Sequence, residues 1–229
     1  MSRSVDFAQL YPVVGLICAT FERLRVTYLI CGSVATYFHG HRARQTHDVD
    51  LLADIKPGHV SRLSAAFSEQ FLNADAQTMN EALDLARVWR EGSQTVNLPS
   101  INLAYRPVQT LHADIFLPIG AAPGLEWRWE REQFKNRVRE RGLDNRQIWI
   151  ASVEDTLIAK MRWYARGHGV SDQQWSDLQI LIQEHRQRVN RRYLGYWAAE
   201  LGLADLWDAV WRGQRPVPPG EEPEQLSLF

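Results

Sequence analysis

Residues 31–52 have the sequence CGSVATYFHGHRARQTHDVDLL, and two aspartates, Asp48 and Asp50, stand one residue apart near its end. Alternate side chains of a strand point to the same face, so these carboxylates lie about 7 Å apart while Val49 and Leu51 point into the core. Two carboxylates this close repel each other unless a cation lies between them, and hard oxygen ligands suit Mg²⁺ or Mn²⁺. The pattern therefore predicts a metal site on a buried strand.

A third carboxylate and a glycine turn extend this predicted site. Asp114 lies between apolar residues in a later strand, and it reaches the same site if the two strands pair side by side. Upstream, an apolar strand ends at Gly32, and Ser33 follows at the start of a helix, where free backbone N–H groups favour phosphate. We interpret the group as a site of nucleotidyl transfer, in which two metal ions bridge a triphosphate and stabilise the leaving pyrophosphate.

The same stretch resembles the signature of DNA polymerase β-type nucleotidyltransferases, which is an apolar strand, Gly-Ser and then Asp-x-Asp, with Asp114 as the later acid. It is most similar to the branch that contains abortive-infection nucleotidyltransferase toxins and uncharacterised relatives. Five positions carry that closer similarity: Gly40, Arg44, Thr46, Asp48 and Asp50. Residues 152–181 resemble the helical part of this branch. The resemblance implies an enzyme that moves a nucleoside monophosphate from an NTP to an acceptor hydroxyl, with Mg²⁺ or Mn²⁺ as cofactor.

Further residues are candidates for binding the nucleotide. Arg44, in the loop before the acidic strand, can hold phosphate or remain a solvated loop arginine. Lys160 is one of only three lysines among the 26 basic residues, and a compact ammonium charge suits a phosphate. The resemblance implies that Lys160 steadies the triphosphate and that Asp177, in the next helix, also belongs to the site.

The order of the apolar patterns predicts an α/β fold, in which a mixed-sheet nucleotidyltransferase domain precedes a helical C-terminal half. The predicted elements before Pro118 are, in chain order, helix 5–25, strand 27–31, helix 33–40, strand 46–55, helices 57–71 and 79–89, and strands 95–105 and 110–118. After Pro118 we expect a Trp- and Arg-rich helix, one short strand at 146–151, and helices from 153 to about 212. The predicted parts are the α/β domain at 1–120, the helical half at 121–212 and a flexible tail at 213–229.

Composition limits the partners and the compartment. With 26 basic and 27 acidic residues the formal net charge is −1, so no global field attracts the chain to nucleic acid or membrane. No apolar run is as long as a membrane span, and the first residues lack the apolar core of a signal peptide. Cys18 and Cys31 lack the spacing of metal ligands, which indicates reduced, buried thiols. We therefore expect a cytoplasmic protein with no membrane partner.

The acceptor is left open by these patterns. The resemblance to toxins favours RNA, and the arginine-rich residues 128–142 and 185–193 can supply a local path for phosphates, although each is also typical of a solvated helix face. A protein hydroxyl or a small molecule is an alternative acceptor. A different class of function is a catalytically silent nucleotide-binding or interaction module that keeps the fold.

The last five residues form a separate motif. Gln225, Leu226, Ser227, Leu228 and Phe229 resemble the peptide by which bacterial replication and repair proteins dock on the β sliding clamp. The leucines and the phenylalanine are apolar anchors, and the Pro- and Glu-rich residues before them predict a flexible linker. The alternative is a terminus that folds back on the helical half. Clamp binding would tether the protein to the sliding clamp and so associate it with DNA replication.

Overall fold

The computed structural model describes residues 7–42, 46–90, 99–118 and 125–216 of the chain. The chain divides into two compact units. The first unit comprises Met1–Phe38 and Arg42–Ser152, and the second comprises His39–His41 and Val153–Phe229. The loop between Phe38 and Arg42 thus belongs, by its contacts, with helices that lie more than a hundred residues later in the sequence.

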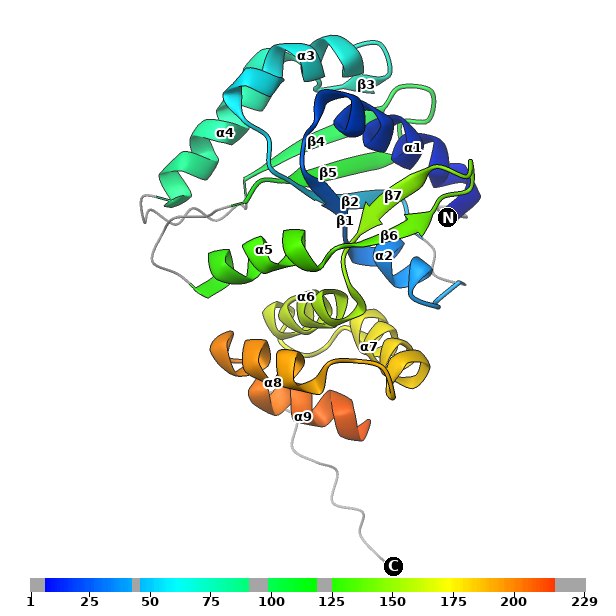
Figure 1. The fold of residues 1–229 in the computed structure, drawn as a ribbon, viewed down its shortest axis with the longest axis vertical. Helices are drawn as coiled ribbons and strands as arrows, with labels where there is room; N and C mark the ends of the chain where they lie inside the picture. The colour runs from blue at the N-terminus through cyan, green and yellow to red at the C-terminus, as the bar shows by residue number, and fades with distance from the viewer. Residues whose placement is uncertain (1–6, 43–45, 91–98, 119–124, 217–229) are drawn as a thin grey trace, which may run out of the picture. The chain divides into compact units, whose positions relative to one another are not determined.

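The first unit is built on a mixed sheet, to which the described residues contribute seven strands in the order β3-β4-β5-β2-β1-β7-β6 (Figure 1). The strands are β1 Tyr28–Ile30, β2 Asp48–Ala53, β3 Phe71–Leu72, β4 Ser100–Tyr105, β5 His112–Phe116, β6 Val138–Arg141 and β7 Gln147–Ile150. Strand β2 runs parallel to β5 and antiparallel to β1, which in turn runs parallel to β7. The predicted mixed α/β fold is confirmed.

Helices flank this sheet, and one of its faces carries the main core. The helices of the first unit are α1 Phe7–Leu24, α2 Gly32–Phe38, α3 Pro57–Phe67, α4 Ala76–Arg90 and α5 Leu125–Asn136. The core cluster joins inward-pointing residues of β2 and β5, such as Val49, Leu51 and Ile115, to apolar residues of α1 and α3, such as Phe21 and Phe67. Val49 and Leu51 are fully buried, so their predicted orientation is confirmed and the aspartates that alternate with them face the other side.

Strands β6 and β7 extend the sheet at one end; β7 corresponds to the short strand predicted at 146–151, whereas β6 was not predicted. Ile150 of β7 pairs with Ile30 of β1, and the Ala151 N–H donates to the Ile30 carbonyl at 2.8 Å. Ile148 and Ile150 are fully buried, so their burial fixes β7 to the sheet. By its contacts, the chain passes from the first compact unit to the second between residues 152 and 153.

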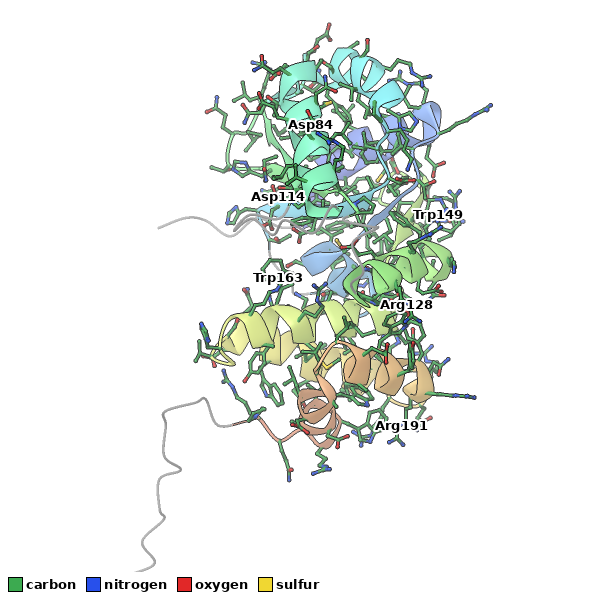
Figure 2. All side chains as sticks on the ribbon, turned by 90° about the vertical axis from the view of Figure 1, so that its left-hand side faces the viewer. Asp84, Asp114, Arg128, Trp149, Trp163 and Arg191 are labelled. Carbon is green, nitrogen blue, oxygen red and sulfur yellow. The ribbon has the colours of Figure 1, made fainter. Side chains whose placement is uncertain are left out.

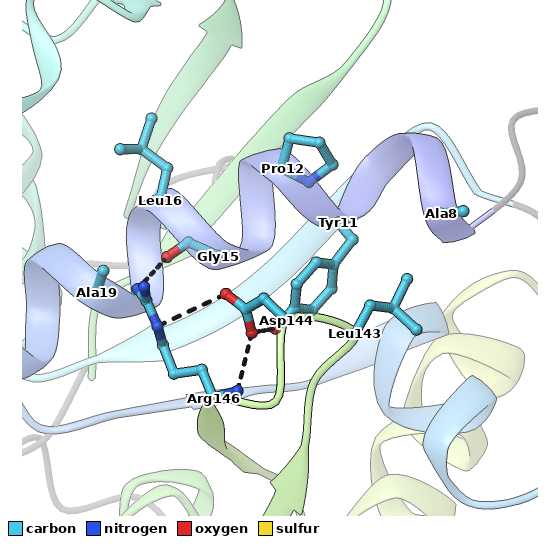
Figure 3. A pocket seen from close by; sticks show the side chains of 9 residues that line it. All are labelled: Ala8, Tyr11, Pro12, Gly15, Leu16, Ala19, Leu143, Asp144 and Arg146. Atoms are coloured by element: carbon cyan, nitrogen blue, oxygen red, sulfur yellow. Dashed lines mark hydrogen bonds and ion pairs between the residues drawn. The ribbon is translucent and has the colours of Figure 1, made fainter.

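Hydrogen bonds connect the turn between β6 and β7 to α1 (Figure 3). The Tyr11 hydroxyl donates to the Asp144 carboxylate at 2.6 Å, and the Arg146 guanidinium donates to the Gly15 carbonyl at 3.1 Å. The hydrogen bond from Tyr11 holds the pKa of Asp144 below its ordinary value. A Cβ atom at Gly142 would lie 1.7 Å from the Tyr11 hydroxyl oxygen, so only glycine fits there. Tyr11, Gly15, Asp144 and Arg146 border a shallow cavity of about 530 Å³ on the surface of α1.

The second unit is helical. Its helices are α6 Val153–Arg166, α7 Asp172–His185, α8 Arg191–Glu200 and α9 Ala204–Arg212. Leu157, Leu178 and Leu194, from three different helices, are fully buried. Side chains cap two of the helices, because Ser171 accepts from the Gln174 N–H and Asn190 accepts from the Tyr193 N–H. No helix within the described residues is long and apolar enough to cross a membrane.

Both cysteines are free thiols, as the sequence predicts, but they differ in exposure. Cys18 is buried inside α1, and this burial raises the pKa of its thiol to about 12, which keeps it protonated and unreactive at neutral pH. Cys31 was also predicted to be buried, yet it is only half-buried. It follows β1 directly, on the face of the sheet opposite the main core, where it packs against a small cluster around Leu29 and Leu52.

Candidate active site

Strand register brings the three predicted acids together. The parallel pairing of β2 with β5 sets Asp50 directly opposite Asp114, and Asp48 follows on the same face of β2. One carboxylate oxygen from each of these three residues can be chosen so that all lie within 4.8 Å of one another. All three side chains are half-exposed, so they form an accessible group on the sheet; Figure 2 marks the place of Asp114.

The carboxylates destabilise one another unless a cation is present. At about 5 Å and an effective dielectric constant near 20, each pair of negative charges repels by roughly 3 kcal/mol. A divalent cation among the three oxygens reverses the sign of this interaction. The described group consists of carboxylates alone, and such hard oxygen ligands suit Mg²⁺ or Mn²⁺ better than zinc.

Each of the two outer acids receives a hydrogen bond from a neighbouring side chain. The Thr46 hydroxyl donates to the Asp48 carboxylate. The Asn102 side-chain amide donates to Asp114 Oδ1 at 2.6 Å. Sequence reasoning did not single out Asn102, although its position between the apolar residues Ile101 and Leu103 of a predicted strand is the signal that places it on the face of the acids.

The middle acid is held by the glycine turn. Gly32 has φ +59°, and a Cβ atom there would lie 1.9 Å from Asp50 Oδ2, so both the backbone conformation and the space require glycine. The Cys31 N–H donates to the Asp50 carbonyl at 2.9 Å, and the Thr36 hydroxyl donates to the Gly32 carbonyl at the same distance. Ser33, the next residue of α2, is mostly buried. The turn predicted to bind phosphate thus lies against the acids.

Lys160 and Asp177 contact each other inside the second unit. Lys160 Nζ lies 2.6 Å from Asp177 Oδ2, and the two residues are 4% and 1% exposed. His41, from the loop that joins this unit by its contacts, lies 3.6 Å from the other oxygen of Asp177. The His39 carbonyl and the His185 ring nitrogen Nε2 are 2.7 Å apart. The two residues singled out in the helical part therefore form one buried ion pair.

Arg44 and the terminal peptide Gln225–Phe229 lie outside the described residues. The arginine-rich stretches are described, and each is divided between two elements. Residues 128–142 form part of α5 and the strand β6, and residues 185–193 join the end of α7 to the start of α8. Arg186 and Arg191 both stack on Trp211, with guanidinium carbons 4.3 and 4.2 Å from the ring centre.

The comparisons with known proteins concern the fold of the chain. No protein-family model and no curated protein matches the sequence. Among solved structures, an antigenic nucleotidyltransferase-like protein from Paracoccidioides brasiliensis matches with a TM-score of 0.54 and 17% identity, over 94% of this chain and 97% of that one. The chain has a nucleotidyltransferase fold. The antibiotic-resistance factor ANT(2'')-Ia matches this fold with a TM-score of 0.52 and 10% identity, over 91% of this chain and 98% of that one.

The contact between Gly32 and Asp50 gives a direct test of the acid group in this nucleotidyltransferase fold. In Gly32→Ala the new methyl group displaces the Asp50 carboxylate, and the left-handed backbone costs roughly 1–3 kcal/mol of unfolding free energy. We expect Mn²⁺ to bind at least about tenfold more weakly, as measured by electron paramagnetic resonance of free Mn²⁺. Gly58→Ala is the control, because a Cβ atom there meets nothing within 4 Å. Equal Mn²⁺ affinity in both variants would contradict the assignment.

Proposed function

We propose that the protein is a metal-dependent nucleotidyltransferase that moves a nucleoside monophosphate from an NTP to an acceptor hydroxyl. The convergence of Asp48, Asp50 and Asp114 within 4.8 Å on a nucleotidyltransferase fold is the observation that supports it. Mg²⁺ or Mn²⁺, held by these acids, would neutralise the triphosphate and the charge that develops on the pyrophosphate. Gly32 and Ser33 would bind phosphate oxygens through the backbone N–H groups of their turn.

The proposed reaction assigns a separate role to Asp114. The acceptor oxygen forms a bond to the α-phosphorus, and the bond from that phosphorus to the bridging oxygen of the pyrophosphate breaks. The hydroxyl proton passes to the Asp114 carboxylate, and pyrophosphate leaves with the electron pair of the broken bond. Asp48 and Asp50, one residue apart on β2, would hold the metal ions throughout, and Asp114 would complete their site.

Calorimetric titration of an NTP with Mg²⁺ tests the binding step. We expect Asp48→Asn with Asp50→Asn to weaken NTP binding by at least about tenfold, because the metal ligands lose their charge. A double variant in two exposed acids, Asp84→Asn with Asp205→Asn, removes the same total charge away from the site and should bind as the wild type does. Equal NTP affinity in the two double variants would overturn the proposed function.

For the acceptor we propose RNA, in keeping with the resemblance to nucleotidyltransferase toxins. The arginine-rich residues of α5, β6 and the α7–α8 junction supply exposed positive charge, including Arg128, Arg139 and Arg188. Incubation with each labelled NTP, with total cellular RNA and separately with lysate protein, should label RNA and should require Asp48 and Asp50. Label on protein or on a small molecule would replace RNA as the acceptor. Nucleotide binding without label on any of them would favour a silent nucleotide-binding module.

For the Lys160–Asp177 pair we propose a role in holding the triphosphate. Because the pair is buried, this role has to be separated from a purely structural one by experiment. Lys160→Met alone leaves Asp177 without this partner, which typically costs about 3–5 kcal/mol of unfolding free energy. The double variant Lys160→Met with Asp177→Leu removes both charges and should recover most of the thermal stability. If Lys160 contacts phosphate, this stable double variant should still bind NTP at least about tenfold more weakly.

The exposed pair of Lys56 and Asp54, whose charged atoms also lie 2.6 Å apart, provides the control for this experiment. Lys56→Met with Asp54→Leu removes the same two charges from the surface and should leave NTP binding unchanged. A Lys160→Met, Asp177→Leu protein that is stable and binds NTP with wild-type affinity would assign the buried pair to folding alone.

The terminal peptide carries a separate proposal, namely docking on a bacterial β sliding clamp through Gln225–Phe229. The apolar anchors Leu226, Leu228 and Phe229 suit a hydrophobic groove, and the motif match supports it. A fluorescent peptide of residues 221–229 should gain anisotropy with purified clamp. Its variant with alanine at Gln225, Leu228 and Phe229 should not. Binding that is absent, or unchanged by these three substitutions, would contradict clamp docking.

A further inference from the structure

Three polar side chains form a row across adjacent strands of the sheet. The antiparallel pairing of β4 with β5 sets Asn102 opposite Asp114, and the parallel pairing of β5 with β2 sets Asp114 opposite Asp50. The row therefore runs from an amide on β4 to the two carboxylates. Asn102 is exposed, and its Nδ2 lies 2.6 Å from Asp114 Oδ1.

A second hydrogen bond fixes the orientation of this amide. The Ser100 hydroxyl, two residues earlier on the same face of β4, donates to Asn102 Oδ1 at 3.3 Å. Because the oxygen end of the amide accepts from Ser100, the nitrogen end is turned toward Asp114. An amide donor facing a carboxylate forms a charge-assisted hydrogen bond, which is stronger than a bond between neutral groups. Ser100 and Asn102 thus hold Asp114 Oδ1 from the β4 side.

We propose that Asn102 is a positioning residue for Asp114, which it holds in the rotamer that presents the carboxylate to the metal and the acceptor hydroxyl. This inference rests on the proposed function. An Asp side chain rotates about two bonds, and half-exposed Asp114 is subject to repulsion from Asp48 and Asp50 on one side. That repulsion tends to turn the carboxylate away from the group. The Asn102 amide, bonded to one of its oxygens, opposes the rotation and keeps the other oxygen available.

The exposure of Asn102 separates this role from a structural one. An exposed cross-strand pair contributes little to stability, so the loss of the Asn102 side chain should leave the fold intact. If the pair merely stabilised the sheet, its removal would change neither metal binding nor turnover. If Asn102 orients a metal ligand, its removal changes both in a folded protein, as is usual for groups that support metal ligands.

The experiment compares Asn102→Leu, which keeps the approximate size but removes the donor, with Asn102→Gln, which keeps an amide. Asn80→Ala, at an exposed position of α4, is the matched control. Mn²⁺ affinity is measured by electron paramagnetic resonance, and kcat and KM for the NTP are measured separately. We expect Asn102→Leu to lower Mn²⁺ affinity by about tenfold and, at a saturating concentration of the metal ion, to lower kcat by about tenfold with KM changed by less than about twofold. Asn102→Gln should recover part of the loss.

A double-mutant cycle shows whether the effect passes through Asp114. In an Asp114→Asn background, Asn102→Leu should have almost no further effect on Mn²⁺ affinity, because the group that it positions is gone. Losses that simply multiply would overturn the inference, and so would an Asn102→Leu protein that equals Asn80→Ala in every measurement. A wild-type protein that binds no Mn²⁺ would instead overturn the proposed function, and the role of Asn102 would fall with it.

Discussion

The parallel pairing of β2 with β5 is the contact on which the candidate site depends. Side chains alternate along both strands, so a shift of one residue in this pairing would carry Asp114 to the opposite face, away from Asp48 and Asp50. The apolar residues between the acids prevent such a shift. Val49 and Ile115 are buried on the core side, and burying side chains of this size typically contributes about 1.5–3 kcal/mol each. Together with their buried neighbours they outweigh a repulsion of roughly 3 kcal/mol per pair of acids.

The sequence predicts the half of the site that lies within one strand. Asp48 and Asp50 share a face in any β-strand, whatever its partner, so their alternation with Val49 and Leu51 was sufficient. Asp114 required a pairing that depends on contacts between distant parts of the chain. The register between β2 and β5 is set by the apolar residues on the buried face of the whole sheet. The local sequence of either strand contains only some of these residues.

Gly32 has a structural role that the sequence did not indicate. The sequence indicated a glycine because phosphate must approach the backbone, and the structure adds that the Asp50 carboxylate already occupies the space beside it. Asn102 was not predicted, because its own residue type gives no signal. A neutral amide on the solvent side of a predicted strand indicates no chemistry by itself, and the role proposed for Asn102 depends on Asp114, which the register places opposite it.

The strand β6 shows where a local pattern misleads. Its sequence, VRER, continues a run of alternating basic and acidic residues that is typical of a solvated helix. Tertiary contacts override this preference. Ile148 and Ile150 anchor β7 in the sheet, and β6 follows as its antiparallel edge. Arg139 then covers Trp149, with its guanidinium carbon 4.0 Å from the ring centre, so the charged strand still protects apolar surface from water.

The loop His39–His41 makes the helical unit dependent on residues that lie far from it in the sequence. It connects α2, which begins at Gly32, to the chain that leads into β2. Within the second unit, His41 lies beside the buried Asp177, and Gly40, with φ +117°, leaves room for the Glu184 side chain, which would lie 3.2 Å from a Cβ atom. A fragment that begins at Val153 would lack these contacts and would leave part of the Asp177 surroundings open to water. The boundary between the units thus separates two sets of contacts and does not cut the chain into two independent segments. The helical unit needs His39–His41 to complete its own interior.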